Sequence, residues 1–438
     1  MSPLLRNRVF LVVAGADLLQ QISIWIRNMA LLFYIMEMTN NDPTAVALLS
    51  ALQYAPILLF SLVGGTFADR WNPKKTVIAG DTLSALSILA ILPLIAAGWW
   101  QAVFAATVVS SIVSQFSQPS SAVLFKRHVP ETQVGAAIGI TQSLMSLFVV
   151  LGPVLGTLIY SRFGLERSLW ALVALFGAAA LLQLLLPASS RSRAGGQAPA
   201  SAWADLRSGF RYVLAHANLR TIGGLFLLLG LAVGVTQPLD VFVTMERLQL
   251  PKEAVQWFAA SEGVGMLIGG AVAAAAAGWA QRRGRLILPL AMLVFAAVTM
   301  TEVLSLWPLL TGSVRVVSGV TMAFFQIVLS ALLIREVAEA YIGRTNGIIT
   351  PLMMGGMLAG TALSGPLVKL VSLFGAYGLS ALLLAAGAVL LTRLRPAGAA
   401  SAGARASDSA VAGEAQYRHS ASANHDSNAR PDARAPDL

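Results

Sequence analysis

The sequence predicts an all-α membrane protein of twelve transmembrane helices in two six-helix repeats, with both termini cytoplasmic. Apolar residues make up 56% of the chain and charged residues only 11%, against about 45–50% and about 25% in soluble domains. A soluble chain of 438 residues would need more charged surface, so the composition favours a lipid environment. The length of the apolar stretches and the placement of the basic residues support the same prediction.

Twelve apolar stretches are long enough to cross a membrane. A hydrocarbon core of about 30 Å needs about 20 residues of helix, and an open sheet edge cannot be satisfied in lipid. The first stretch is too long for a signal peptide, and it contains Asp17 and Arg27. The predicted spans are 9–36, 44–68, 75–97, 100–125, 133–161, 165–186, 219–245, 253–280, 286–304, 308–334, 343–370 and 373–394.

Basic residues gather in alternate loops between these spans. With a cytoplasmic N-terminus, 19 Lys and Arg residues fall in inside segments and five lie at or near the outer surface. The positive-inside rule therefore places both termini in the cytoplasm, and an even number of helices agrees. A nucleic-acid-binding protein would instead collect its basic residues on one polar face, so we expect no nucleic-acid partner.

Several classes of enzyme and metal site are excluded by missing residues. The chain has no cysteine, which rules out disulfides and thiolate metal sites. Its four histidines are too scattered for a zinc-binding helix, and no lysine follows a glycine, so there is no P-loop. The nucleophile elbow G-x-S-x-G is also missing. We therefore expect no enzyme activity, no cofactor and no metal.

The composition divides the chain into four parts. A polar connector with an amphipathic helix, 188–217, separates an N-terminal six-helix half, 1–187, from a C-terminal half, 218–395. The amphipathic helix carries Phe210 on its apolar face and is expected to lie on the inner membrane surface. Residues 396–438 have too few large apolar side chains to order themselves and predict a disordered cytoplasmic tail.

The two halves are related by a shift of 208 residues. Eight of nineteen positions between Arg127 and Met145 are identical to those between Arg335 and Met353. Both segments fall at the cytoplasmic junction between the fourth and fifth helix of their half. The similarity predicts parallel repeats about an axis along the membrane normal, with a substrate site between the halves near the midplane.

The loop between the second and third spans carries a recognisable motif, G-G-T-F-A-D-R-W-N-P-K-K from Gly64 to Lys75. It resembles the signature loop of the major facilitator superfamily, G-x-x-x-D-R-x-G-R-K. Asn72 stands at the family glycine, which is tolerable because Asn also adopts positive φ. The resemblance covers about residues 5–395. It implies a gating motif in which the acid and its basic neighbours latch the halves together: Gly65, Asp69, Arg70, Asn72, Lys74 and Lys75.

Further segments resemble the bacterial exporter branch that holds macrolide and siderophore effluxers. These are W-I-R-N-M-A in the first span and F-S-Q-P-S-S-A-V-L-F before Lys126. Gly152, Pro153 and Gly156 in the fifth span resemble the antiporter motif G-x-x-x-G-P-x-x-G-G, and such small residues let helices approach closely. The fourth span lacks the R-x-x-q-G motif of many drug–proton antiporters, which leaves the proton pathway open.

Polar residues inside the spans mark the candidate cavity, because each intramembrane charge costs about 2.5–3.5 kcal/mol at a helix centre. Five of them share an arc of about 120° on the first span and are expected to face one cavity. Asp81 is expected to support the signature loop. The candidates for ion coupling and substrate binding are Asp17, Gln20, Gln21, Arg27, Asn28, Asp240, Glu262, Arg315 and Gln326.

Together these features predict a carrier in a bacterial cytoplasmic membrane that exports a hydrophobic or amphipathic compound in exchange for protons. We expect it to act as a monomer. One alternative keeps the fold and reverses the direction, giving a proton-coupled uptake symporter for a polar metabolite. A second alternative is a membrane sensor that transports nothing.

Overall fold

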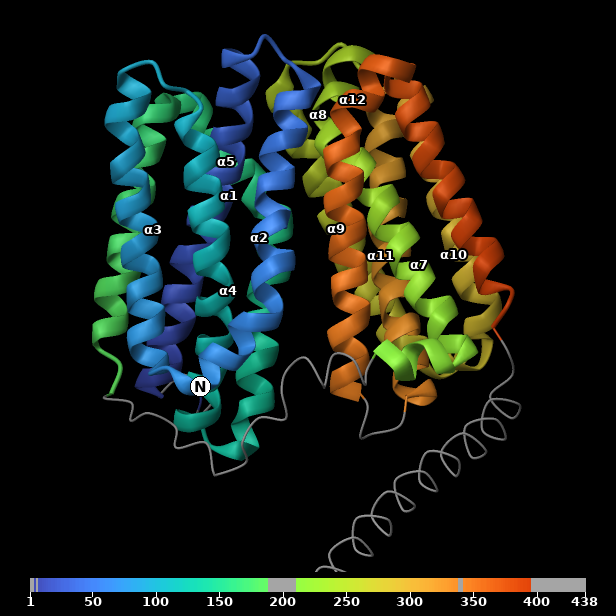
Figure 1. Cartoon of the computed structure of the whole chain (residues 1–438), viewed down its shortest axis with the longest axis horizontal. Helices are drawn as coiled ribbons and strands as arrows, with labels where there is room; N and C mark the ends of the chain where they lie inside the picture. Colours follow the sequence, from blue (N-terminus) through green and yellow to red (C-terminus); the bar gives the residue numbers. More distant parts are fainter. Residues whose placement is uncertain (1–3, 5–6, 188–209, 338–341, 395–438) are drawn as a thin grey trace, which may run out of the picture.

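Figure 1 shows the computed structural model, which describes residues 4, 7–187, 210–337 and 342–394. Most of the predicted connector and the whole predicted tail lie outside the described residues. The N-terminal half consists of α1 (Arg8–Met38), α2 (Pro43–Arg70), α3 (Pro73–Ala96), α4 (Ala102–His128) and α5 (Glu131–Leu184).

The C-terminal half is also helical, and its first transmembrane segment is irregular. In that segment α7 (Ala217–Thr236) continues through a 3-10 turn, η2 (Gln237–Leu239), a short helix, α8 (Asp240–Phe242), and a π-helical turn, η3 (Val243–Arg247). The remaining elements are η4 (Lys252–Ala254), α9 (Val255–Ala275), α10 (Ala277–Leu304), α11 (Pro308–Glu336) and α12 (Ile342–Leu391).

Local chemistry explains where several helices begin. The Asn7 side chain caps α1 by accepting hydrogen bonds from the backbone N–H groups of Val9 and Phe10. Asn72 caps α3 in the same way, and Pro73 occupies the first helical position. Asn72 has a φ of −73°, so the expectation that it replaces a glycine by adopting positive φ is wrong. It begins a helix instead.

The structure is an all-helical bundle suited to a membrane. Nine helices of the described chain are long and apolar enough to span one, and Ala102–Ser117 is a shorter apolar run. The start of α1 and the end of α12 lie at the same end of the bundle (Figure 1), which we call the terminal end. The turns that join α1 to α2 and α10 to α11 lie at the opposite end.

Two of the long helices are interrupted by one residue of left-handed backbone. Gly164 divides α5 with a φ of 71° and a ψ of −177°, and Ser372 divides α12 with a φ of 69° and a ψ of 171°. The two positions are 208 residues apart, the same shift that aligns the sequences of the halves. Each break falls within one or two residues of a predicted boundary between spans.

The buried apolar side chains show where the halves are joined. Among the described residues, one cluster near the opposite end combines both halves, with Phe33 and Leu172 packed together with Val255 and Tyr377. The two other clusters belong to single halves: one surrounds Phe10 in the N-terminal half and one surrounds Phe325 in the C-terminal half. The shared core therefore holds the halves together at the opposite end.

The two interruptions predict opposite responses to exchanged residues. The backbone at Ser372 lies in a region that only glycine adopts freely, and such strain costs on the order of 1–3 kcal/mol. Ser372→Gly should therefore raise the melting temperature of the purified protein, and Gly164→Ser should lower it. Nothing lies within 4 Å of a Cβ built at Gly164. A lower melting temperature of Gly164→Ser would therefore result from backbone strain and not from a steric clash. Equal melting temperatures for both variants would contradict this explanation.

Candidate functional site

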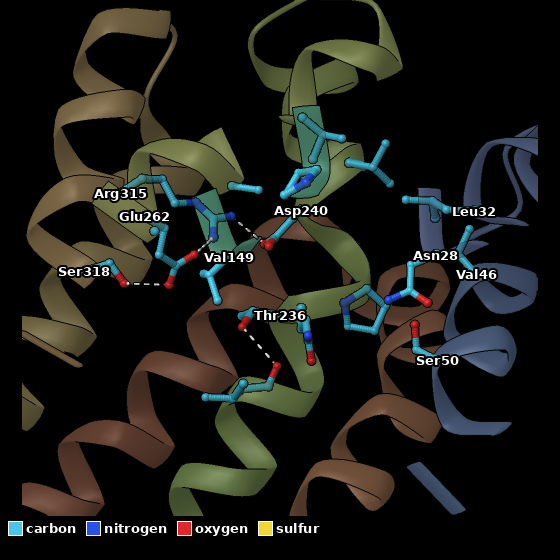
Figure 2. A pocket seen from close by; sticks show the side chains of 18 of the residues that line it. Asn28, Leu32, Val46, Ser50, Val149, Thr236, Asp240, Glu262, Arg315 and Ser318 are labelled. Atoms are coloured by element: carbon cyan, nitrogen blue, oxygen red, sulfur yellow. Dashed lines mark hydrogen bonds and ion pairs between the residues drawn. The ribbon is translucent and has the colours of Figure 1, made fainter. Parts of the chain in front are cut away.

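A cavity of about 490 Å³ lies between the two halves of the bundle. The N-terminal half contributes side chains from α1, α2, α4 and α5, and the C-terminal half contributes side chains from α7 to α12. Figure 2 shows Asn28 and Ser50 on one side of it and Arg315 and Glu262 on the other. Part of the lining is apolar or polarisable: Trp25, Met29, Leu32, Val233, Met266, Phe295 and Met322.

Arg315 on α11 is surrounded by three carboxylates of the C-terminal half. Its guanidinium lies 2.6 Å from Asp240 Oδ1 and 2.9 Å from Glu262 Oε2, and it also pairs with Glu302. Arg315 is 7% exposed and Glu302 is 6% exposed, so water compensates these two charges poorly. Four helical segments, α8, α9, α10 and α11, therefore meet through one cation.

Neutral groups orient two of the three acids. The hydroxyl of Tyr377 donates a hydrogen bond to Asp240 Oδ1 at 3.1 Å. Ser318 donates to Glu262 Oε1 at 3.4 Å (Figure 2). Asp240 follows directly after the 3-10 turn Gln237–Leu239, where the α-helical pattern of this segment is broken. With all groups ionised, three negative charges face one positive charge. The cluster therefore favours the binding of a proton or of a cationic group.

The N-terminal wall of the cavity has the opposite sign. Arg27 on α1 is buried, and its guanidinium donates to Ser110 Oγ of α4 and, at 3.2 Å, to Asn28 Oδ1. Both acceptors are neutral, and no carboxylate of the described residues pairs with Arg27. The cavity therefore has an acidic wall in one half and a cationic wall in the other.

A second polar cluster lies inside the N-terminal half, away from the cavity lining. Asp81 of α3 accepts hydrogen bonds from Gln20 of α1 and Gln183 of α5, each at 2.9 Å. Asp17 lies close enough to interact electrostatically with Asp81. Asp81 thus joins three helices, and the expectation that it also supports the signature loop stays a prediction.

The polar stripe predicted on the first span is divided between these two places. Arg27 and Asn28 line the cavity, whereas Asp17, Gln20 and Gln21 do not. On α11 the cavity is lined by Arg315, whereas Gln326, one helical turn beyond the lining residue Met322, is exposed and is not among the lining residues. The prediction of a single cavity-facing stripe was therefore wrong for the part of α1 nearest the terminal end.

Two residues of the acidic wall were missed in the sequence. Glu302 lies two residues before the end of α10, where an acid looks like an ordinary helix terminus. Its position inside the predicted span 286–304 was the available signal. Tyr377 is an aromatic residue in an apolar segment, and no local pattern distinguishes it from core.

The signature loop is only partly described. Gly65, Asp69 and Arg70 belong to the last turns of α2, and the structure does not describe the side chains of Asp69 and Arg70. Lys74 donates hydrogen bonds to the carbonyl oxygens of Leu184, at 3.0 Å, and Leu186. It therefore caps the last turn of α5, where a cation is favoured by the helix dipole. Lys75 is exposed and follows the Asn72 cap.

The antiporter-like motif brings α5 against α1. A Cβ at Gly152 would lie 2.3 Å from the ring of Trp25, and one at Gly156 would lie 2.5 Å from the Trp25 carbonyl oxygen. Pro153 lines the cavity. In the other half, a Cβ at Gly360, 208 residues after Gly152, would lie 2.3 Å from the Leu231 carbonyl oxygen of α7. The motif glycines thus allow the same close approach in each half.

Two ion pairs of the described residues join the halves at the opposite end. Lys252 lies 2.7 Å from Glu37 Oε1, and Lys369 lies 2.9 Å from Asp42 Oδ1. Burial raises the pKa of Asp42, but hydrogen bonds from Lys369 and Thr44, together with the charge of Lys369, outweigh it and leave the pKa below its ordinary value. Asp42 is therefore ionised at neutral pH, and both pairs reinforce the shared core.

The sequence is similar to known membrane transporters. Residues 13–312 match the family model of the Major Facilitator Superfamily, which is more than half of the chain. The chain is 25% identical over 282 residues to the uncharacterized MFS-type transporter YkuC of Bacillus subtilis, covering 61% of this chain and 64% of that protein. It thus spans less than two thirds of YkuC.

Two further relatives are named as exporters. Enterobactin exporter EntS of Citrobacter koseri is 27% identical over 390 residues, covering 84% of this chain and 87% of EntS. Macrolide efflux protein A of Streptococcus pyogenes is 30% identical over 149 residues, covering 32% of this chain and 35% of that protein.

Solved structures share the fold. The nucleoside transporter NupG gives a TM-score of 0.68 at 16% identity, covering 90% of this chain and 98% of NupG. A D-xylose-proton symporter gives a TM-score of 0.66 at 14% identity, covering 89% of this chain and 98% of the symporter.

The charge balance around Arg315 predicts a non-additive response to mutation. Arg315→Met leaves three carboxylates without their cation, and breaking such a buried cluster costs about 3–5 kcal/mol. We expect a large fall in melting temperature, which Glu302→Gln and Asp240→Asn in the same chain should partly restore. Arg8→Gln, which removes a charge from an exposed position, is the control. If the decreases in melting temperature caused by the individual substitutions simply add up in the combined variant, the cluster does not act as a unit.

The ion pairs at the opposite end predict a shift in conformation. The chain has no cysteine, so Trp99→Cys and Trp307→Cys give one spin label on each half, in exposed turns at this end. Adding Glu37→Gln and Asp42→Asn should increase the population with longer label distances a few-fold, because exposed pairs contribute about 0.2–1 kcal/mol each.

A matched control for this measurement removes two acids from the same end. Glu166→Gln and Glu246→Gln change exposed residues that form no ion pair between the halves in the part of the chain that the structure describes. Their distance distribution should match the parent. If the label distances increase equally in this control and in the Glu37→Gln, Asp42→Asn variant, the net charge of this end, and not the ion pairs, keeps it closed.

Proposed function

Because this chain belongs to the major facilitator superfamily, and is thus a secondary transporter and not an enzyme, we propose that it exports hydrophobic or amphipathic compounds in exchange for protons. The observation that carries the proposal is the Arg315 cluster, which faces a cavity between the two halves. An ion-coupling site must reach the substrate cavity and must hold a variable charge, and this cluster does both.

Proton antiport follows from the charge balance of the cluster. One guanidinium neutralises one of three carboxylates, so the acidic wall binds a proton when the cavity faces the side of higher proton concentration. Release of that proton on the other side restores the negative charge. If the substrate occupies the cavity best in one protonation state, the two movements become coupled.

The similarity to two exporters and the apolar part of the lining support export of amphipathic compounds. EntS is named as an enterobactin exporter, and the S. pyogenes relative is named as a macrolide efflux protein. Cavities that take large apolar ligands are lined mostly by apolar side chains with a few placed polar groups, and Trp25, Met29 and Phe295 supply such surface here.

We further propose the orientation and the conformation. The excess of basic residues supports a terminal end in the cytoplasm of a bacterial cell, and in this proposal α5 and α12 each form two of twelve spans. The opposite end, which the shared core and the ion pairs hold together, then faces outward, so this is a state closed to the outside. Asp69 and Arg70 are proposed to latch the cytoplasmic end in the other state, and the carrier to work as a monomer.

Transport by inside-out membrane vesicles tests the proposal. A panel of fluorescent amphiphiles (ethidium, phenylnaphthylamine and anilinonaphthalene sulfonate) should include compounds that accumulate in the vesicles when a pH gradient is applied. Accumulation should collapse when an uncoupler dissipates the gradient. Asp240→Asn with Glu302→Gln should abolish it, whereas Glu246→Gln, at an exposed residue that does not line the cavity, should not.

Other outcomes of this experiment separate the alternatives. Proton-driven accumulation in right-side-out vesicles and not in inverted ones would indicate an uptake symporter. Accumulation that survives the uncoupler but stops with a sodium ionophore would replace the proton by sodium. No transport of any compound in either orientation would favour a membrane sensor.

A further inference from the structure

Arg27 is a buried cation in the cavity wall that has no acidic partner among the residues that the structure describes. Its side chain is 7% exposed, and its hydrogen bonds go to Ser110 and Asn28, which are neutral. The other buried arginine of the cavity, Arg315, has three carboxylates around it. The charge of Arg315 is thus compensated by carboxylates, whereas the charge of Arg27 in the same cavity is not.

An unpaired charge in this position needs an explanation, because burying an ion without a counter-charge costs several kcal/mol. The acids of the cavity do not supply one, since all three are within ion-pair distance of Arg315 on the C-terminal half. Asn28, which accepts a hydrogen bond from Arg27, lies across the pocket from Arg315 and Glu262 (Figure 2). None of the described acids of the cavity is thus left for Arg27, and a molecule that enters the cavity can supply the counter-charge.

We propose that Arg27 binds an acidic group of the transported compound, so that the substrates are amphipathic molecules carrying a carboxylate or sulfonate. This deepens the proposed function and rests on it. Ser110 and Asn28 hold the guanidinium in place and leave part of its donors for an oxyanion, a geometry that guanidinium groups satisfy with two parallel hydrogen bonds. The apolar body of the substrate packs on Trp25 and Met29, the neighbours of Arg27 along α1.

The acidic wall of the cavity can bind a second charged group of the same substrate. A cationic group elsewhere on the same molecule meets Glu262 and Asp240, which are partly exposed to the cavity. A zwitterionic amphiphile therefore complements both walls. A purely cationic amphiphile complements the acidic wall alone and leaves Arg27 unpaired.

A structural role for Arg27 makes a different prediction. If its only role is to join α1 to α4 through Ser110, its loss weakens the fold and affects all ligands alike. An anion-binding role affects only ligands with an acidic group. Charge selectivity therefore separates the two.

The experiment measures binding to the purified full-length protein in neutral detergent, without a gradient. The probes are anilinonaphthalene sulfonate and its neutral relative phenylnaphthylamine, with empty micelles subtracted. Arg27→Gln should weaken binding of the sulfonate at least about tenfold, because a hydrogen bond to a charged group contributes about 1.5–3 kcal/mol. Binding of the neutral probe should change less than about twofold, and Arg27→Lys should retain part of the sulfonate affinity.

Arg8→Gln is the matched control, since it removes the same charge from an exposed position at the start of the same helix. Its affinities should equal those of the parent. Equal losses for both probes, or an unchanged sulfonate affinity in Arg27→Gln, would overturn the assignment. If Arg27→Gln fails to fold, two other measurements test the anion site: the sulfonate affinity of Arg27→Lys, and the ratio of sulfonate to neutral-probe affinity in the parent. Equal affinities of the parent for the two probes would contradict the anion site.

Failure of the proposed function would look different. Binding needs no proton gradient and no direction of transport, so a charge-selective effect of Arg27 with no transport in vesicles would leave the anion site standing. Transport of the neutral probe with no charge-selective binding would leave the exporter standing and remove the anion site.

Discussion

The burial of charge in a low-dielectric bundle is the constraint on which this structure depends. The guanidinium of Arg315 can remain ionised inside the protein because three carboxylates from separate segments surround it. That requirement decides how α8, α9, α10 and α11 are rotated against one another. The break between Thr236 and Asp240 serves the same end, since it places one of the acids beside the cation.

The N-terminal half solves the same problem with neutral partners. Asp81 is held by the amides of Gln20 and Gln183, and Arg27 by Ser110 and Asn28. Amides and hydroxyls satisfy hydrogen bonds without cancelling charge, so this half retains an unpaired cation at the cavity. Two halves related by sequence thus provide walls of opposite sign, and a molecule lying between them meets both.

The way the halves are joined explains how such a cavity could open to alternate sides. At the opposite end Phe33 and Tyr377 belong to one shared core, which the pairs Glu37–Lys252 and Asp42–Lys369 border. Toward the terminal end each half has an apolar core of its own. We therefore expect each half to move as a unit, with the contacts of the shared core being the ones that a rocking motion exchanges.

The sequence by itself determined the composition-dependent features: a helical membrane protein, most span boundaries, and the relation between halves that Gly164 and Ser372 repeat in their backbone. It also identified Asp240, Glu262 and Arg315 singly, because any intramembrane charge is conspicuous. Only the tertiary structure decided their pairing, the inclusion of Glu302, and the separation of Asp17 from Arg27. Pairing depends on how distant helices are rotated and bent against one another, and ten residues of helix carry two groups of one stripe about 15 Å apart. The local sequence pattern contains neither the rotation of distant helices nor the position of a residue along the helix axis relative to the cavity.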